Sequence, residues 1–369
     1  MPFEPQTLFP GQLADSVAKL AQDVASHHPQ QPPASIINDM GWNAVLVPEG
    51  LGGIGGNFED LASILEGLAS NAVSLPVITR CGIIPSILGA LPDNPQARAL
   101  LQGIADGNCV VELGGPLGAH QPTPPLSAQP SPSGWRVSGT TPPISLTEDC
   151  THALLVCRDT ANHQLMLACA EAQALRRRVM EFGTMDDRKV ASCRLESLEI
   201  AAGHVLSAGL QAEQAIQSGL QLGVTAVATD TVSAMGSMLA RTIAYLLERR
   251  QFGQPLAQFQ ALRHDVARLY IVYETARSLL QASLGALETA RHDSRQASDM
   301  TPFELLGLYM SQEAIPFAES VIQLHGGMGM TREMPAAQLA TRLMANAFLF
   351  SDPLAYRHNL HAMRSRMPS

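Results

Sequence analysis

The sequence predicts a mainly α-helical protein with a central β-domain, and three observations support this prediction. Apolar residues recur at helical spacing through most of residues 1–108. Short β-prone runs separated by Gly and Pro follow over 109–205, and long segments of helical periodicity occupy 206–369. Because 369 residues are many for one simple domain, we predict three domains with these boundaries.

Helices are predicted in the first domain from the spacing of its apolar residues. Leu13, Val17 and Leu20 recur every three or four residues. A Gly-rich segment over 41–56 interrupts this pattern, and helical spacing resumes at Phe58. We interpret the 41–56 segment as a structural turn between helices.

Short strands are predicted in the second domain. The runs 135–139, 153–157 and 165–169 are short and β-prone, and Pro and Ser are dense over 116–132. Several short strands with Gly and Pro between them are typical of a small antiparallel barrel or sandwich.

Three long helices are predicted in the third domain, over 206–250, 258–292 and 302–324. Long helices joined by short turns favour an antiparallel bundle. This order of domains excludes a Rossmann enzyme and a TIM barrel, because both need alternating β and α units.

Composition excludes several classes of protein. Apolar residues make up 46% and charged residues 15%, which excludes a disordered chain. The net charge of −9 argues against nucleic acid as a partner. The sequence has no long uncharged apolar run and no signal-peptide pattern, so we expect no membrane span. The six cysteines form no CxxC pair, and we therefore expect a reduced, cytoplasmic protein without a metal site.

The first motif that points to chemistry is the run RRQFGQPLAQFQ over 249–260. One interpretation is an ordinary helix end with basic residues and a Gly stop. The other is a charged fork for a phosphate, because Arg249 presents planar donors and Gln260 an amide. Both interpretations stay open at this point.

The second motif is the run QLHGGMGMT over 323–331. Its glycines would let a ligand approach the backbone and would leave amide N–H groups free. The alternative is a Gly-rich helix stop. A helix rather than a strand precedes the run, so it is not a Rossmann fingerprint.

Together these motifs resemble those of acyl-CoA dehydrogenases. The segments GW…VPE.LGG.G, R.QFG.PL..FQ and Q.HGG.G.T.E.P occur in the family's order, and the resemblance covers nearly the whole chain. It implies an acyl-CoA dehydrogenase-like fold: an N-terminal helical domain, a small β-barrel and a C-terminal four-helix bundle.

The resemblance also implies an FAD cofactor bound across a subunit interface. Such enzymes remove the α-proton of an acyl-CoA thioester with a carboxylate and transfer a β-hydride to the flavin, whose electrons pass to an electron-transfer flavoprotein. By position, Arg249 would lie at the FAD pyrophosphate, with Phe252 and Gln260 beside the adenosine. The residues expected to line the adenosine and pyrophosphate from the neighbouring subunit are Gln323, Gly326, Gly327 and Gly329.

The catalytic base is the first departure from the family pattern. Phe350 stands about where the family's usual Glu is expected, and nearby Asp352 fits a cap or turn equally well. Some branches of the family place the acid on the helix before the RxxFG motif instead.

Asp230 is the only carboxylate in the central part of that helix. Burial would raise its pKa toward a value useful for a base, and we therefore predict Asp230 as the base. The alternative is a buried, hydrogen-bonded Asp or one on a solvated face.

The predicted β-domain is a further departure from the family pattern. The family's TEP…GSD segment is reduced to Glu112 and a few glycines within 110–118, and 142–146 replaces the residues that usually cover the flavin. The chain is therefore better suited to hold the adenosine half of FAD than its ring. One branch of the family pairs two unlike chains as an α2β2 heterotetramer that acts on steroid-derived acyl-CoA.

Several alternatives follow from these departures. The chain is either a dehydrogenase, as a homo- or hetero-tetramer, or a non-catalytic subunit that completes the FAD site of an active partner chain. A flavin monooxygenase on the same fold is a third interpretation. The run Arg176–Arg178 would either meet CoA phosphates or form a solvated loop.

Overall fold

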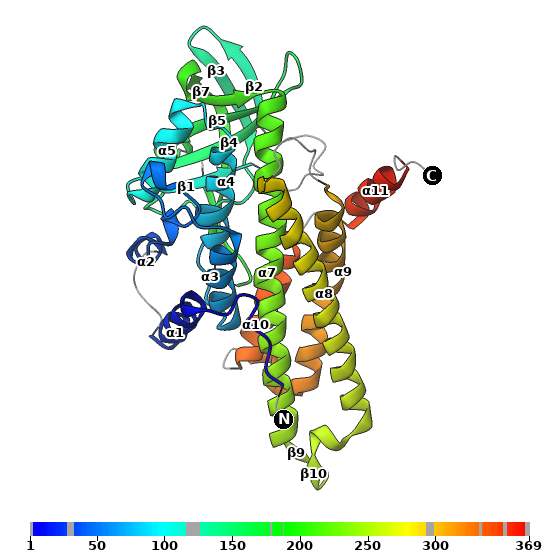
Figure 1. Cartoon of the computed structure of the whole chain (residues 1–369). Helices are drawn as coiled ribbons and strands as arrows, with labels where there is room; N and C mark the ends of the chain where they lie inside the picture. Colours follow the sequence, from blue (N-terminus) through cyan, green and yellow to red (C-terminus); the bar gives the residue numbers. More distant parts are fainter. Residues whose placement is uncertain are drawn as a thin grey trace. The chain divides into compact units, whose positions relative to one another are not determined.

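The computed structural model in Figure 1 describes residues 3–27, 33–115, 126–177, 179–186, 188–292, 299–331, 334–349 and 353–365. The chain forms two compact units. The first, the helical unit, comprises Met1–Pro29, Ala62–Ser74 and Val224–Ser369. The second, the mixed unit, comprises Gln30–Leu61 and Leu75–Gly223.

The predicted domain boundaries fall where the secondary structure changes type. The boundary at 108/109 lies between helix α5 (Pro95–Ala105) and strand β1 (Val111–Gly114). The boundary at 205/206 lies within strand β8 (Val205–Ala208), just before helix α7 (Leu210–Glu248). Because α7 and α3 (Phe58–Ser70) each contribute to both units, the three-domain division stays a prediction.

The mixed unit begins with short helices around the predicted turn. They are α2 (Pro33–Asp39), the 3-10 turns Trp42–Ala44 and Glu49–Leu51, the π-helix Ile78–Ile83, α4 (Ile84–Gly89) and α5. The turn over 41–56 is packed, as predicted: a Cβ on Gly53 would lie 2.0 Å from the Val47 carbonyl oxygen. The buried Asn43 also donates to the Ile104 carbonyl at 2.6 Å. This segment therefore has a structural role.

The mixed unit also carries an eight-stranded sheet in the order β6-β7-β3-β2-β4-β5-β8, with β1 on β4. The remaining strands are β2 (Leu126–Ser131), β3 (Gly134–Thr140), β4 (His152–Asp159), β5 (Leu165–Glu171), β6 (Val179–Gly183) and β7 (Lys189–Ala201), and α6 (Ala172–Leu175) follows β5. The predicted runs lie in β3, β4 and β5.

The expectation of a purely antiparallel sheet was wrong. Strands β1 and β2 both run parallel to β4 and pair with successive parts of it, whereas β5 pairs antiparallel. Inward-facing apolar side chains of β2, β3, β4, β5 and β7 form one core, with Leu126, Val137, Leu155, Met166 and Cys193 among its members.

The helical unit contains α1 (Gln12–His27), most of α7, α8 (Gln260–His292), α9 (Thr301–His325), α10 (Pro335–Ala347) and α11 (Pro353–Arg364). The three predicted long helices are confirmed as α7, α8 and α9. Helix α9 packs against α8, α10 and α11. Buried hydroxyls of α7 bond to carbonyls one turn back, as Thr242 does to Met238 at 2.7 Å, so they cost little inside the bundle.

Two further features bear on the predicted class of protein. Among the residues that the structure describes, no helix is both apolar enough and long enough to cross a membrane. All six cysteines are free thiols, and only Cys109 is not fully buried.

Candidate functional site

Asp230 lies on α7 inside the helical unit, with 2% of its surface exposed. Arg342 of α10 forms a two-pronged ion pair with it: Nε lies 2.8 Å from Oδ1 and Nη2 lies 2.5 Å from Oδ2. Asn346, one turn further along α10, donates to Oδ1 at 2.6 Å. Both carboxylate oxygens therefore have strong donors.

The same guanidinium group also holds the chain after α3. Nη1 of Arg342 donates to the Val73 carbonyl at 2.8 Å and to the Ser74 hydroxyl at 3.0 Å. Arg342 thus joins α7, α10 and the segment after α3. Several hydrogen bonds donated in one plane to different acceptors are typical of an arginine side chain and not of lysine.

This geometry argues against Asp230 as the base. A proton on Asp230 would remove the counter-charge of a buried guanidinium, which is costly. The structure instead favours the alternative interpretation, a buried and hydrogen-bonded aspartate, and we infer that Asp230 positions α10. Phe350 and Asp352 lie outside the described residues.

Sequence reasoning missed Arg342 and Asn346. Their spacing of four residues places both on one face of α10, beside the buried Leu339 and Leu343. Polar residues on an apolar helix face were the available signal, but they do not identify a partner on α7.

The first predicted cofactor motif forms a hairpin after α7. Strands β9 (Arg250–Gln251) and β10 (Gln254–Pro255) pair antiparallel and are joined by only Phe252 and Gly253. Both turn residues have positive φ, 53° and 80°, as type I′ turns require. Arg249, just before the hairpin, and Gln260, at the start of α8, are exposed.

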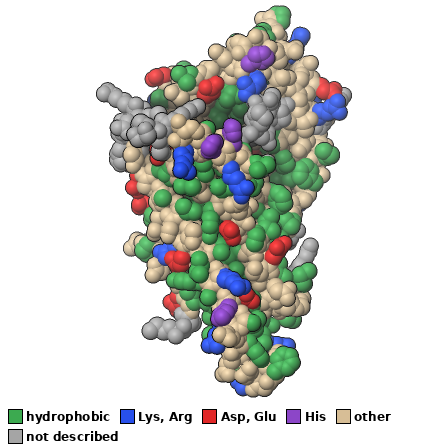
Figure 2. All heavy atoms as spheres, turned by 90° about the vertical axis from the view of Figure 1, so that its right-hand side faces the viewer, with side chains coloured by type: hydrophobic (Ala, Val, Ile, Leu, Met, Phe, Trp, Pro, Cys, Tyr) green, Lys and Arg blue, Asp and Glu red, His purple; other side chains and the backbone are tan. Residues whose placement is uncertain are grey.

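Phe252 is strained and exposed. An aromatic residue is rare at positive φ, where Asn or Gly is preferred. Its side chain is 91% exposed, with an edge-on contact to Phe259 at 6.1 Å between ring centroids. Figure 2 shows hydrophobic and basic side chains together at the lower tip, the level at which Figure 1 places β9 and β10. Because strain of this kind is found at functional sites, the hairpin fits a binding role better than a plain helix stop.

The second predicted motif follows α9 as a short 3-10 turn, Gly326–Met330. Gly326 has φ 60° and ψ −142°, a conformation open essentially only to glycine. A Cβ on Gly326 or Gly327 would meet nothing within 4 Å, whereas one on Gly329 would lie 2.6 Å from the Ile322 carbonyl oxygen. Gly329 is therefore needed by the turn itself, while the backbone at Gly327 is open to a ligand. Gln323 is exposed beside them.

The structure brings the two motifs together within the helical unit. Tyr245, on the last turn of α7, stacks on His325, the last residue of α9, with ring centroids 4.6 Å apart. All seven predicted cofactor residues thus belong to one unit, and the ends of the two helices that carry them are in contact.

In the mixed unit, Glu112 is held by a partner that sequence reasoning missed. Arg80, on the π-helix, donates from Nε to Glu112 at 2.6 Å and from Nη2 to the Thr147 hydroxyl at 2.6 Å. Its Nη1 lies 3.4 Å from Asp149. Burial raises the pKa of Glu112 to about 7, although the charge of Arg80 opposes this shift.

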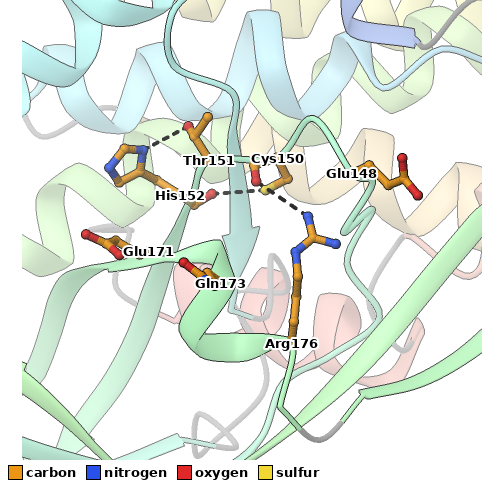
Figure 3. Close-up of a pocket in the computed structure, with 7 residues that line it drawn as sticks. All are labelled: Glu148, Cys150, Thr151, His152, Glu171, Gln173 and Arg176. Carbon is orange, nitrogen blue, oxygen red and sulfur yellow. Dashed lines mark hydrogen bonds between the residues drawn. The ribbon is translucent and has the colours of Figure 1, made fainter.

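Figure 3 shows a polar recess of about 330 Å³ in the mixed unit. It is lined by Glu148, Cys150, Thr151, His152, Glu171, Gln173 and Arg176. Arg176 points to the Cys150 carbonyl there, at 3.5 Å (Figure 3). It also donates to the Thr147 carbonyl at 2.5 Å, so it holds a loop. With Glu148 and Glu171 on its walls, the recess does not suit a CoA phosphate. Arg177 is exposed, and Arg178 lies outside the described residues.

We predict that Glu112 makes stability depend on pH. Because the pKa of Glu112 is raised from 4.5 to about 7, the folded state binds more protons than the unfolded state in this range. The contribution of Glu112 to the free energy of unfolding is therefore fully present below pH 4.5 and is lost as pH rises through about 7. Glu112→Gln should flatten the fall in melting temperature between these pH values.

The control for that experiment is Glu199→Gln. Glu199 lies at the surface, where hydrogen bonds from Arg136 lower its pKa, so its removal should leave the slope above pH 5 unchanged. An unchanged slope in Glu112→Gln would contradict the prediction.

We also predict that Asp230→Asn destabilises the protein by about 3–5 kcal/mol, because it leaves Arg342 buried without a counter-charge. Urea denaturation measures this change, and Glu213→Gln, on an exposed part of α7, should change stability by less than about 0.5 kcal/mol. Full stability in Asp230→Asn, with loss of turnover alone, would restore the base assignment.

Comparisons with known proteins agree with the fold and the motifs. A sequence model described as the acyl-CoA dehydrogenase C-terminal domain matches residues 213–350. Acyl-CoA dehydrogenase FadE28 of Mycobacterium tuberculosis is 26% identical over 343 residues, which cover 89% of this chain and 92% of that protein.

Two solved structures share the fold. A variant of the Tcur3481-Tcur3483 steroid acyl-CoA dehydrogenase matches with a TM-score of 0.80 and 21% identity, covering 96% of this chain and 97% of its own. The ChsE4-ChsE5 complex from Mycobacterium tuberculosis also matches with a TM-score of 0.80, at 17% identity, covering 98% of this chain and 99% of its own. The predicted fold class is confirmed, and over nearly its whole length the chain is similar to acyl-CoA dehydrogenases, a family of FAD-dependent oxidoreductases whose C-terminal domain model matches residues 213–350.

Proposed function

We propose that this chain takes part in FAD-dependent α,β-dehydrogenation of an acyl-CoA thioester, as the subunit that holds the adenosine half of a shared FAD. The observation that carries the proposal is the pair of exposed motifs, RRQFG and QLHGG, held next to each other in one unit. We therefore propose that one chain presents both motifs to the same FAD, in place of the expectation that the second motif comes from the neighbouring subunit. A partner dehydrogenase chain supplies the rest of the site.

The residues of this surface fit a dinucleotide. Arg249 presents an exposed guanidinium, which suits a pyrophosphate, and the backbone at Gly327 is open, without a side chain in the way. The preceding Gly326 N–H donates to the Gln323 carbonyl and holds the turn. The exposed ring of Phe252 provides a face for the adenine. Gln260 and Gln323 are exposed amides for its polar edges or the ribose.

When bound, FAD would accept the hydride from the β-carbon of the substrate. The base is a separate requirement, because removal of the α-proton needs a carboxylate free to accept it. In this chain Asp230 is paired with Arg342, and Glu112 with Arg80. Neither of these two buried carboxylates is free to accept the proton, and our proposal assigns the base to the partner chain, with this chain as the subunit that completes its FAD site.

The names of similar proteins support the same assignment. ChsE4-ChsE5 and Tcur3481-Tcur3483 are named as pairs, and the latter is described as a steroid enzyme. By analogy we propose a heterotetramer with a bulky, steroid-derived acyl-CoA as substrate and an electron-transfer flavoprotein as electron acceptor. The free cysteines are compatible with the cytoplasmic location that we propose for it.

The open backbone at Gly327 gives a direct test of FAD binding. Gly327→Ala adds a methyl group that meets nothing within the chain but stands where the dinucleotide would approach. We expect the melting temperature of the ligand-free protein to be unchanged and the affinity for FAD to fall about tenfold, measured by fluorescence titration.

Gly329→Ala serves as the contrasting variant. Its Cβ would collide with the Ile322 carbonyl, so it should lower the melting temperature even without FAD. Unchanged FAD affinity in Gly327→Ala would exclude this backbone as the dinucleotide site.

The strained turn gives a second test. Phe252→Asn places a residue that tolerates positive φ in the hairpin, so the protein should keep its stability or gain up to about 1 kcal/mol. FAD binding should weaken because the aromatic face is lost. Loss of stability together with intact FAD binding would show that Phe252 serves the fold and not the cofactor.

A further inference from the structure

The contact between Tyr245 and His325 joins, side chain to side chain, the two helices that lead into the cofactor motifs. The rings stack at 27° between planes, and the Tyr245 hydroxyl donates to the His325 carbonyl at 3.4 Å. The residues are 80 positions apart in the sequence, so this contact depends on the packing of α7 against α9.

Each ring is tied to its own motif. The Arg249 backbone N–H donates to the Tyr245 carbonyl at 2.8 Å, so Tyr245 lies one turn before the first motif and is hydrogen-bonded to it. His325 belongs to the second motif and directly precedes its 3-10 turn, which begins at Gly326. A shift of either ring would therefore move the residues that follow it.

His325 is fixed in its own helix. Its side chain is buried, and Nδ1 lies 3.0 Å from the Val321 carbonyl, which requires the hydrogen on Nδ1. The turn after it wraps closely, because a Cβ on Gly329 would come within 3.0 Å of the His325 Cβ. The imidazole is thus a rigid platform for Tyr245 and not a side chain that swings freely.

We propose that Tyr245 and His325 are positioning residues that set the spacing between the two dinucleotide-binding motifs. The inference rests on the proposed function. A ligand that spans two segments binds well only when the distance between the segments matches the length of the ligand. If the Tyr245–His325 stack were absent, some of the binding free energy would be used to order the two segments. The pair itself does not touch the ligand in this account.

The experiment compares ADP binding by calorimetry in the full chain, because ADP contains the adenosine and pyrophosphate parts that this surface would hold. Tyr245→Leu removes the ring and should weaken ADP binding about tenfold. Tyr245→Phe keeps the ring and should restore binding to within about twofold of wild type.

The chain offers a matched control in Tyr309. Its hydroxyl donates to the Val272 carbonyl at 3.4 Å and so joins α9 to α8 in the same way, without either motif nearby in sequence. Tyr309→Leu should lower the melting temperature in the manner of Tyr245→Leu and leave ADP affinity within about twofold of wild type.

A second variant covers the case in which Tyr245→Leu does not fold. His325→Asn retains a donor for the Val321 carbonyl but removes the stacked ring, and it should show the same loss of ADP affinity. Equal ADP affinities in the Tyr245, His325 and Tyr309 variants would overturn the positioning role alone. Absence of ADP binding by the wild-type chain, both alone and in a complex with a partner dehydrogenase, would overturn both this inference and the proposed function.

Discussion

A buried arginine needs a buried counter-charge, and in the helical unit this requirement is met by Arg342 and Asp230. The guanidinium uses its donors on the carboxylate of α7 and on the chain after α3, while Asn346 adds a further hydrogen bond. Because the ion pair crosses from α10 to α7, it holds α10 against α7. The chemistry follows from this constraint: a carboxylate that balances a buried charge is not free to take a proton from substrate.

The mixed unit follows the same rule. Arg80 is buried among Glu112, Thr147 and Asp149, so the acidic residue that remains from the family's β-domain motif is also engaged. In contrast, most of the residues that match the family's FAD motifs are exposed and unobstructed. Engaged carboxylates together with an open dinucleotide surface are what is expected of one half of a shared site.

Much of the fold could be predicted because its signals are local. The segment predicted over 258–292 is found as Gln260–His292, since helical periodicity is a property of neighbouring residues. The parallel pairing of β1 and β2 with β4 could not be predicted, because short apolar runs do not reveal strand direction. Sequence patterns are equally unable to show which distant residues pair in the candidate site.

The partners of the two acidic candidates are distant in sequence. Asp230 and Arg342 are 112 positions apart, and no local pattern links them. Asp230 could be recognised as a lone carboxylate in an apolar helix, but whether it serves as a base or an ion-pair partner depends on what folds against it. At Phe252 the sequence indicated a helix end with a Gly stop, and only the structure showed the hairpin there and its exposed, strained ring.

Flavin content tests most directly whether this chain holds only part of a flavin site. The chain would be purified alone and after co-expression with candidate partner dehydrogenases, and the visible spectrum recorded before and after adding acyl-CoA thioesters. The account predicts little bound FAD and no bleaching for the chain alone, but bound FAD that bleaches with substrate in one co-expressed complex. A yellow chain with about one FAD per subunit that is bleached by acyl-CoA without any partner would contradict it.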